Sequence, residues 1–267
     1  MKNIVLVFLL FFCSLLYSQT KLLSWNIENL GKSKSTSEIA FMAQTVQDYD
    51  IIAIQEVVGG YGGAQAVAQL VDVLNRKGAK WDYVISNPTS SSAYKTERYA
   101  YIWKTSKLKK IGRAWLEKQF ALEIDREPYY CTFEYENKQF TVINFHAITK
   151  SKQPEREIKH FKFIPEEYPN LNLIFAGDFN CPQSHSVFYP LKMMGYSSIF
   201  INQKTSLKQE CKNNKCLASE FDNMYYKTSK IKFINSGVIL FYKNFNSLKE
   251  ARKISDHIPI WFQFSLN

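Results

Sequence analysis

The stretch ISDHIPIW, residues 254–261, places Asp256 and His257 directly before the apolar run of the last predicted strand. A buried strand has no structural need for a carboxylic acid and an imidazole immediately before its first residue. The plain alternative is a surface turn that leads into an edge strand, because Pro259 follows His257 by two residues. The rest of the chain has to decide between a turn and a functional site.

Hydrophobic periodicity predicts strands that alternate with helices along the chain. Ser35 and Glu38 have the spacing of a helix capping box, and Glu136-Asn137-Lys138 has the composition of a hairpin turn. The antiparallel pairs and intervening helices predict an α/β (α+β) protein with a mixed sheet and helices outside. Strands are expected over residues 21–27, 50–57, 81–86, 98–104, 129–135, 139–145, 171–176, 220–226, 232–241 and 254–264, and helices over 35–49, 64–77, 154–168 and 187–194.

The first 18 residues have the pattern of a cleaved secretory signal. Lys2 supplies the positive start, residues 4–16 are almost entirely apolar, and cleavage is expected after Ser18. The apolar run is short for a membrane span, although a retained N-terminal anchor is the alternative. We therefore expect a secreted or periplasmic protein without stable membrane association, in which residues 19–267 form one domain.

Charge and cysteine content narrow the expected partners and bonds. The formal net charge is +10, and +9 without Lys2; an excess of this size favours a polyanionic partner, unless it serves only solubility. Cys211 and Cys216 flank the polar stretch KNNK and are expected to join as a disulfide at a hairpin tip. Cys131 lies in an apolar run and is expected to be a buried free thiol. Metal binding by these thiols is not expected, because no nearby histidine or second close cysteine pair accompanies them.

Polar residues interrupt the predicted strands repeatedly at one end. Each has an ordinary explanation as a turn or strand-end residue. In a mixed sheet, however, the start of one strand can lie beside the end of its neighbour, so all of them can meet at one rim. The stretches are SWNIENLG (Asn26, Asn29), AIQEVV (Glu56), NFHAIT (His146), FAGDFN (Asp178, Asn180), EFDNMYY (Asp222) and SDHIPI (Asp256, His257).

The chemistry of this set is coherent. Carboxylates and side-chain amides are hard oxygen ligands that suit Mg²⁺, Mn²⁺ or Ca²⁺ rather than Zn²⁺. Histidines add proton transfer near neutral pH. Tyr94 and Arg98 in YKTERYAY and Arg126 in DREPYY are cationic or phenolic groups suited to holding phosphate. Together these groups predict hydrolysis of a phosphoester.

These motifs resemble the endonuclease/exonuclease/phosphatase superfamily and, within it, deoxyribonuclease I most closely. GDFN and SDH point to the superfamily, whereas YKTERY and REP point to the nuclease branch. The resemblance implies a four-layer α/β/β/α sandwich of two mixed sheets with outer helices. It also implies a monomeric, divalent-metal-dependent endonuclease in which water attacks phosphorus in line and leaves 5′-phosphate ends on DNA, with RNA as an open possibility.

The resemblance also assigns roles. Glu56 would be the principal metal ligand, with Asn26 and Asp256 beside it; Mg²⁺ is the expected ion, Mn²⁺ a substitute, and Ca²⁺ a structural or second ion. His257, held by Asp222, would act as base, and His146, held by Glu97, would face the other side of the phosphate, although the sequence does not decide which histidine performs which step. The remaining expected site residues are Asp178 and Asn180, which would position the water, a second metal or the phosphate, and Arg126 and Tyr94, which would contact phosphate.

The sequence departs from the deoxyribonuclease pattern in places. Val57-Val58 follow Glu56, where the mammalian enzyme has a groove-reading arginine nearby, and the small disulfide loop before REP is absent. The family also makes Cys181–Cys216 an alternative disulfide. Two other functions stay open: a phosphoesterase of the same fold that acts on lipid or small-molecule phosphates, as a sphingomyelinase does, and a non-catalytic binding domain. The last should have lost Glu56, His146, Asp178 or His257, and none is lost.

Overall fold

The fold is described from a computed structural model that covers residues 19–91 and 96–267. The predicted signal peptide, residues 1–18, lies outside the described residues, and so does Tyr94. No helix within the two described stretches is long and apolar enough to cross a membrane.

The chain folds into strands interspersed with short helices. The strands are β1 (Thr20–Leu30), β2 (Ile51–Val58), β3 (Trp81–Ile85), β4 (Glu97–Lys104), β5 (Lys109–Leu116), β6 (Tyr129–Tyr135), β7 (Lys138–His146), β8 (Leu173–Asp178), β9 (Tyr196–Ser198), β10 (Leu207–Lys212), β11 (Lys215–Leu217), β12 (Asp222–Lys227), β13 (Ile231–Val238) and β14 (Ile260–Leu266). The α-helices are α1 (Thr36–Val46), α2 (Tyr61–Asn75), α3 (Glu155–Ile158), α4 (Ile164–Glu167), α5 (Tyr189–Met193) and α6 (Leu248–Ala251). The 3₁₀ turns are η1 (Lys150–Lys152), η2 (Lys159–Lys162), η3 (Ser186–Phe188) and η4 (Phe241–Asn244).

The strands form two large mixed sheets. The first has the order β13-β14-β1-β2-β4-β3 and the second β5-β6-β7-β8-β12-β9. At the centre of each sheet lies one parallel pair, β1 with β2 and β7 with β8, and all other neighbours are antiparallel. The carboxyl ends of each parallel pair therefore lie side by side, next to the first residues of their antiparallel neighbours.

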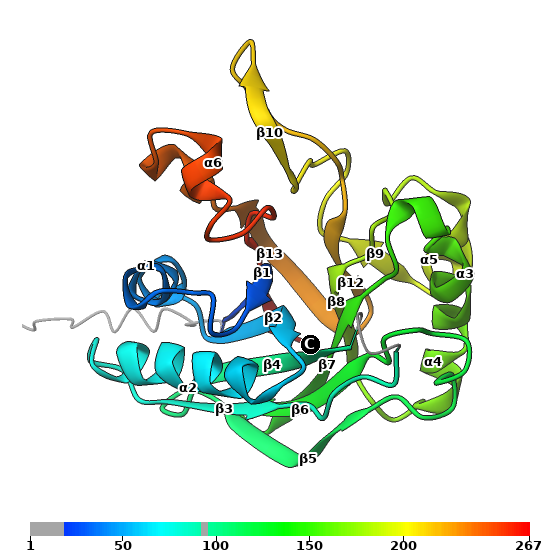
Figure 1. Cartoon of the computed structure of the whole chain (residues 1–267). Coiled ribbons are helices and arrows are strands. Elements are labelled where there is room, and N and C mark those ends of the chain that lie inside the picture. The colour runs from blue at the N-terminus through cyan, green and yellow to red at the C-terminus, as the bar shows by residue number, and fades with distance from the viewer. Residues whose placement is uncertain (1–18, 92–95) are drawn as a thin grey trace, which may run out of the picture.

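Three apolar clusters hold the layers together. One lies between the two sheets and includes Tyr101, Phe133 and Phe262. A second packs α1 and α2 on the outer face of the first sheet, and a third packs the short helices α3, α4 and α5 on the outer face of the second. Figure 1 shows the helices on opposite outer sides of the molecule. The predicted four-layer α/β/β/α sandwich is confirmed.

Most local predictions are confirmed, including the capping box of α1, in which Ser35 and Glu38 bond reciprocally, and the β6–β7 hairpin. The prediction of a continuous helix over 154–168 is wrong. The segment divides into α3, η2 and α4. Pro165, in the first turn of α4, has no N–H to donate to the preceding turn, so the helix restarts there.

The prediction that the last strand begins at residue 254 is also wrong, because β14 begins only at Ile260. The preceding residues carry Asp256 and His257 and bond to residues 205–207 and, through the Ser255 and Trp25 side chains, to β1 instead of continuing the β14 ladder. Strands β5 and β9, at the two edges of the second sheet, were not predicted. In β5 the ladder is interrupted around Gly112, whose φ is +62°, so the segment lacks the regular alternation that identifies a strand.

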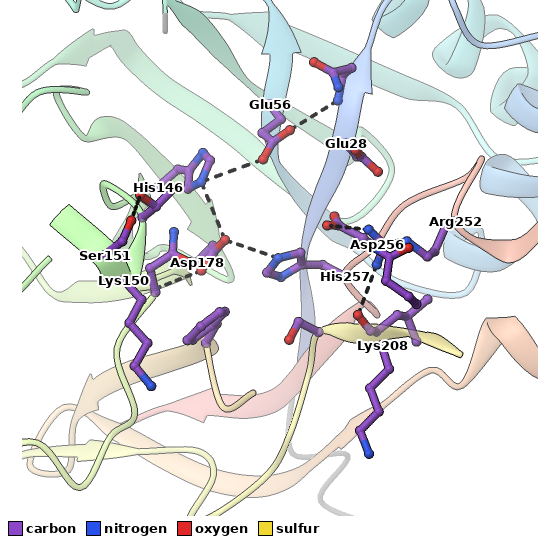
Figure 2. Close-up of a pocket in the computed structure, with 17 residues that line it drawn as sticks. Glu28, Glu56, His146, Lys150, Ser151, Asp178, Lys208, Arg252, Asp256 and His257 are labelled. Atoms are coloured by element: carbon purple, nitrogen blue, oxygen red, sulfur yellow. Dashed lines mark hydrogen bonds and ion pairs between the residues drawn. The ribbon is translucent and has the colours of Figure 1, made fainter. Parts of the chain in front are cut away.

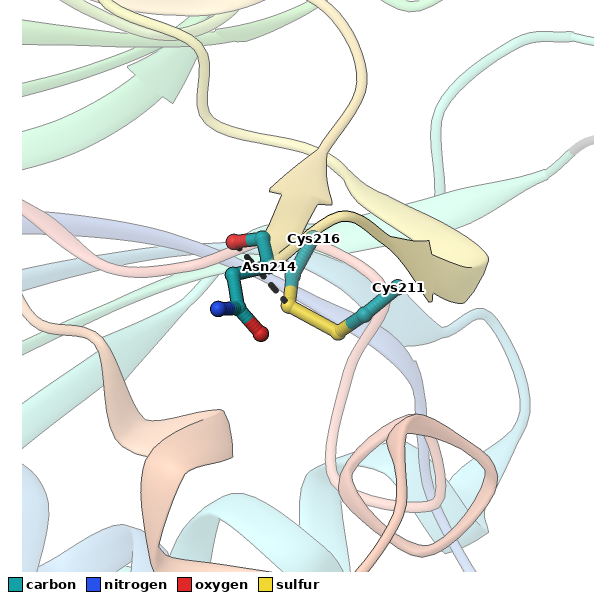
Figure 3. The surroundings of a disulfide bond; sticks show 3 residues. All are labelled: Cys211, Asn214 and Cys216. Carbon is teal, nitrogen blue, oxygen red and sulfur yellow. Dashed lines mark hydrogen bonds between the residues drawn. A yellow bond between two sulfur atoms is a disulfide. The ribbon is translucent and has the colours of Figure 1, made fainter.

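The cysteines behave as the local sequence indicates. Cys211 and Cys216 form a disulfide near the tip of the β10–β11 hairpin (Figure 3), which rules out the alternative Cys181–Cys216 pairing. Cys131 and Cys181 are buried free thiols. Burial raises the pKa of each of these two thiols to about 12, so neither forms a thiolate readily near neutral pH.

This arrangement predicts the thiol count of the protein that begins at Gln19. Titration with a thiol-specific chromogenic disulfide should find no rapidly reacting thiol in the native protein, because Cys131 and Cys181 are buried and protonated. In denaturant without reductant it should find two thiols per chain, and reductant should expose two more. Four reactive thiols in unreduced, unfolded protein would contradict the disulfide.

Candidate active site

The polar strand ends meet at one rim between the two sheets. In the first sheet, Asn26 lies near the end of β1 and Glu56 near the end of β2. In the second, Asp178 at the end of β8 is the register partner of both His146 on β7 and Asp222 on β12. Figure 2 shows Glu56, His146 and Asp178 converging on one pocket together with His257. The predicted convergence of the strand ends is confirmed.

Gly177 permits the pairing that brings His146 beside Asp178. Its φ is +143°, a conformation that side chains disfavour, and a Cβ atom there would lie 1.9 Å from the carbonyl oxygen of Phe145. The FAGDFN motif therefore contains a glycine because the backbones of β7 and β8 approach closely at this point. Only glycine allows the ladder to continue to His146 and Asp178.

Glu56 reaches the rim through a break in the regular strand. Its φ is +60°, and the register of β2 against both of its neighbours shifts between residues 54 and 57. The Glu56 carboxylate accepts hydrogen bonds from Asn26 Nδ2 at 3.0 Å and from the Asn29 backbone N–H at 3.3 Å. A left-handed glutamate costs conformational energy, and such strain is concentrated at functional positions.

The Asn26 amide lies between two carboxylates, at a position where a cation would be stabilised. Its Nδ2 donates to Glu56 and also to Asp178 Oδ2, at 3.1 Å. Its own Oδ1 is buried without a hydrogen-bond partner. Rotation of this amide by half a turn would exchange its nitrogen and oxygen and bring the unpartnered oxygen toward the two carboxylates. Two carboxylates and an amide oxygen are donors that a hard divalent ion prefers, so the residues present fit the expected metal.

His146 is held by a carboxylate on one side and faces the centre on the other. Its Nδ1 lies 2.9 Å from Glu97 Oε2, while Nε2 lies 3.6 Å from Asp178 Oδ2 and 3.8 Å from Glu56 Oε1. Burial is the largest single influence and acts to lower the pKa of His146, but the charge and hydrogen bond of Glu97 together with the charge of Asp178 outweigh it, and the pKa is raised. The expected pairing of Glu97 with His146 is confirmed.

His257 has the same arrangement on the opposite side of Asp178. Its Nδ1 lies 2.7 Å from Asp222 Oδ2, and its Nε2 lies 3.6 Å from Asp178 Oδ2. Burial again acts to lower the pKa of His257, yet Asp222 and Asp178 raise it well above 6.5. Burial would raise the pKa of Asp178, whereas the two imidazoles lower it. Asp178 therefore lies between two imidazoles, each fixed by its own carboxylate.

The segment around ISDHIPIW is tied to β1 by specific bonds. Ser255 Oγ donates to the Asn26 carbonyl at 2.6 Å and accepts from the His257 N–H at 3.0 Å. The Trp25 indole N–H donates to the His257 carbonyl at 2.8 Å. His257 is thus positioned by contacts to the metal-site strand rather than by an ordinary turn.

Asp256 occupies a different position from the buried carboxylates. Its side chain is 30% exposed, lines the pocket and lies 3.4 Å from Arg252 Nη2. Asp178, Asp222 and His257 form another group whose ligand atoms lie within 4.8 Å of one another. Asp222 Oδ2, however, already accepts a hydrogen bond from Thr205 Oγ1 and pairs with His257 Nδ1, whereas each Glu56 oxygen accepts one hydrogen bond and Asn26 Oδ1 accepts none.

Arg126 and Asn180 fix the end of β7. The buried Arg126 guanidinium donates from Nε to the His146 carbonyl at 3.0 Å and from Nη2 to the Ala147 carbonyl, and it lies 3.6 Å from Glu97. Asn180 Nδ2 donates to the same Ala147 carbonyl at 3.1 Å. Both residues border hollows at the rim, and phosphate contact by Arg126 stays a prediction.

The pocket has a basic wall that the sequence did not reveal. Its volume is about 610 Å³, and three cationic side chains line it: Lys150, Lys208 and Arg252. Lys150 follows NFHAIT closely, so its proximity to His146 was a usable signal. Arg252 lies two residues before ISDHIPIW and was a usable signal as well, whereas Lys208 lies far from any motif and reaches the site only because β10 packs against α6.

Comparison with known proteins defines the class. The model of the Endonuclease/Exonuclease/phosphatase family matches residues 23–257, and the chain belongs to this family. It is therefore a hydrolase of the nuclease and phosphoesterase class. A protein named deoxyribonuclease from Thioalkalivibrio sp. (strain K90mix) is 24% identical over 268 residues, covering 92% of this chain and 71% of that protein.

Solved structures share the fold. The D. rerio TDP2 complexed with single strand DNA product superposes with a TM-score of 0.62 at 14% identity, covering 93% of this chain and 99% of that one. The mannosyl-6-phosphatase of Bacteroides thetaiotaomicron VPI-5482 gives a TM-score of 0.64 at 18% identity, with 93% and 99% coverage. At these identities the likeness establishes architecture and not substrate.

The close approach at Gly177 predicts a large effect of one methyl group. Gly177→Ala should destabilise the protein by more than ~3 kcal/mol, because the new Cβ meets the Phe145 carbonyl directly. Gly195→Ala is the matched control: its φ of +87° is also left-handed, but nothing lies within 4 Å of the added Cβ. The control should lose only about 1 kcal/mol. Chemical denaturation measures both, and equal losses would refute the steric account.

Proposed function

We propose that this protein is a secreted endonuclease that uses a divalent metal ion, Mg²⁺ above all, to hydrolyse DNA phosphodiesters and leave 5′-phosphate ends. The observation that carries the proposal is the pair of buried imidazoles on either side of Asp178, each backed by a carboxylate and adjoining the oxygens of Glu56 and Asn26. The relative named deoxyribonuclease and the basic pocket wall support a nucleic-acid substrate. Export rests on the pattern of residues 1–18 alone.

The protein groups have distinct tasks in this proposal. Asp222 accepts a hydrogen bond from His257 Nδ1–H and so leaves Nε2 of the neutral imidazole to take a proton from the attacking water. Glu97 fixes His146 in the same way, and the protonated His146 would donate from Nε2 toward the opposite side of the phosphate. Glu56 and Asn26, with Asp256 beside them, would hold the metal. When bound, the ion supplies positive charge that stabilises the developing charge on phosphate.

The proposed substrate is tested by a panel. Purified protein with Mg²⁺ should convert supercoiled plasmid into nicked and linear forms, and the new ends should ligate without prior treatment by a kinase. RNA, sphingomyelin and sugar phosphates belong in the same panel. Rapid hydrolysis of sphingomyelin or a sugar phosphate with plasmid left intact would establish the alternative phosphoesterase function.

Metal removal gives the next prediction. Chelation by EDTA should abolish plasmid cleavage, and added Mg²⁺ or Mn²⁺ should restore it, because the converging donors are oxygens suited to hard cations. Glu56→Gln should raise the metal concentration needed for half-maximal activity, since the charged ligand is removed. Undiminished hydrolysis in metal-free buffer would refute the mechanism.

The histidines should behave as proton-transfer groups. His146→Ala or His257→Ala should each reduce kcat by ~10²–10⁴, and the double variant should lose much less than the product of the single losses. Asp222→Asn should also slow turnover, because it favours the wrong His257 tautomer. The exposed His185 provides the control, and His185→Ala should leave kcat unchanged.

Thermal melting distinguishes these losses from unfolding. The histidine variants should still melt cooperatively well above the assay temperature, because both imidazoles border the pocket and belong to none of the three apolar clusters. Near-wild-type cleavage by His257→Ala would show that the ISDHIPIW segment is only a turn.

A further inference from the structure

The β10–β11 hairpin extends from the rim of the active site away from the body of the protein (Figure 1). Its turn is Asn213-Asn214, with φ of +51° and +59°. Two successive left-handed residues make a type I′ turn, which matches the twist of the flanking strands. The tip is therefore a regular hairpin and not an irregular loop.

The base of the hairpin is fixed to the catalytic segment. The Leu207 N–H donates to the Asp256 carbonyl at 2.7 Å, and Arg252 Nη1 donates to the Leu207 carbonyl at 3.0 Å. Ser206 also forms an antiparallel bridge with His257. Leu207 and Cys216 are buried in the same apolar cluster as Leu248 of α6. The hairpin consequently holds a defined position relative to His257.

The tip of the hairpin carries two positive charges side by side, and their repulsion destabilises the hairpin. Lys212 and Lys215 are exposed register partners across the hairpin, and directly opposed like charges destabilise a strand pair. Neither forms a salt bridge with any other residue in the described part of the chain. The Cys211–Cys216 disulfide braces the adjacent position (Figure 3), where an unsupported two-stranded hairpin would be marginally stable. The tip is thus stiffened while keeping two unpaired cations together.

We propose that this hairpin is a binding arm for a polyanionic strand, in which Lys212 and Lys215 contact backbone phosphates beyond the cleavage site. This inference rests on the proposed nuclease function and deepens it. Lys208 lies on the pocket wall, and Lys212 is four residues further along β10. At ~3.3 Å per residue the tip lies ~13 Å from the pocket, which corresponds to about four base pairs of duplex DNA.

The composition of the tip favours nucleic acid over a membrane surface. Residues 209–215 are QECKNNK and include no aromatic or aliphatic side chain that could enter a lipid interface. A rigid arm with fixed cations suits a phosphate backbone, because little ordering is required on binding. The partner is therefore a strand of DNA or RNA that extends from the active site across this arm.

The test compares Lys212→Gln/Lys215→Gln with the matched pair Lys77→Gln/Lys80→Gln. Lys77 and Lys80 are exposed and precede β3, whose start lies at the opposite end of the first sheet from Glu56. Cleavage of a 40-base-pair duplex and of bis(p-nitrophenyl) phosphate, a small diester, is measured with Mg²⁺ over a range of salt concentrations. Melting curves and disulfide mapping verify that each variant is folded.

The hairpin variant should raise KM for the duplex about tenfold at low salt. It should reduce the slope of log kcat/KM against log salt by ~0.9 for each phosphate that the arm no longer neutralises. Hydrolysis of the small diester should be unchanged, and the matched pair should behave like the wild type on both substrates. Shortening the duplex to fewer than about four base pairs on the arm side should remove the difference between hairpin variant and wild type.

Four results would overturn the inference. If the wild type cleaves the duplex and the hairpin variant has the same KM and salt slope, the binding-arm inference is refuted and the proposed nuclease function is not. An equal loss in the matched pair shows that only overall charge matters. Weaker binding of the variant to phosphatidylserine-containing vesicles, with duplex cleavage unchanged, assigns the arm to membranes. A wild type that does not cleave nucleic acid overturns the proposed function and the inference together.

Discussion

The buried carboxylate of Asp178 is the group on which the geometry of the site depends. A single oxygen, Oδ2, lies 3.6 Å from Nε2 of both His146 and His257 and accepts a hydrogen bond from Asn26. Its other oxygen accepts from the backbone N–H of Asn180. Burial by itself disfavours an ionised carboxylate. The hydrogen-bond donors and the two imidazoles around Asp178 compensate for the missing water and lower its pKa. Displacing any of these partners would alter the charge balance of the others.

The two sheets are held in one relative position by hydrogen bonds between buried side-chain amides, and this position brings the polar residues together. Beneath the rim, the Gln55 amide donates to Ser24 within the first sheet and to Asn144 in the second. Asn144 in turn donates to the Ile54 carbonyl of β2. These bonds lie in an otherwise apolar interface, where a shifted packing would leave buried amides unsatisfied. They therefore favour the one sheet arrangement in which Asn26 and Glu56 face His146 and Asp178.

The sequence predicted the buried architecture and the inner site well, because strong patterns encode both. Apolar runs beside GDFN, NFH and SDH located Asp178, His146 and His257, and the family resemblance implied that Glu97 and Asp222 hold the two histidines. Contacts that depend on irregular backbone were not predictable. The left-handed Glu56, the late start of β14 and the approach of Arg252 to Leu207 follow from tertiary bonds that have no local period. The proline-broken segment 154–168 was predictable in principle, since Pro165 is visible in the sequence.

The central claim is that one carboxylate couples two histidines, one at the end of β7 and one in the segment before β14. Its most direct test is an NMR titration of the His146 and His257 imidazoles in metal-free protein, for the wild type and for Asp178→Asn. The account predicts that both pKa values fall in the variant, because the negative charge that stabilises each imidazolium is removed while Glu97 and Asp222 stay in place. A fall in the pKa of only one histidine, or of neither, would contradict a shared carboxylate at the centre of the site.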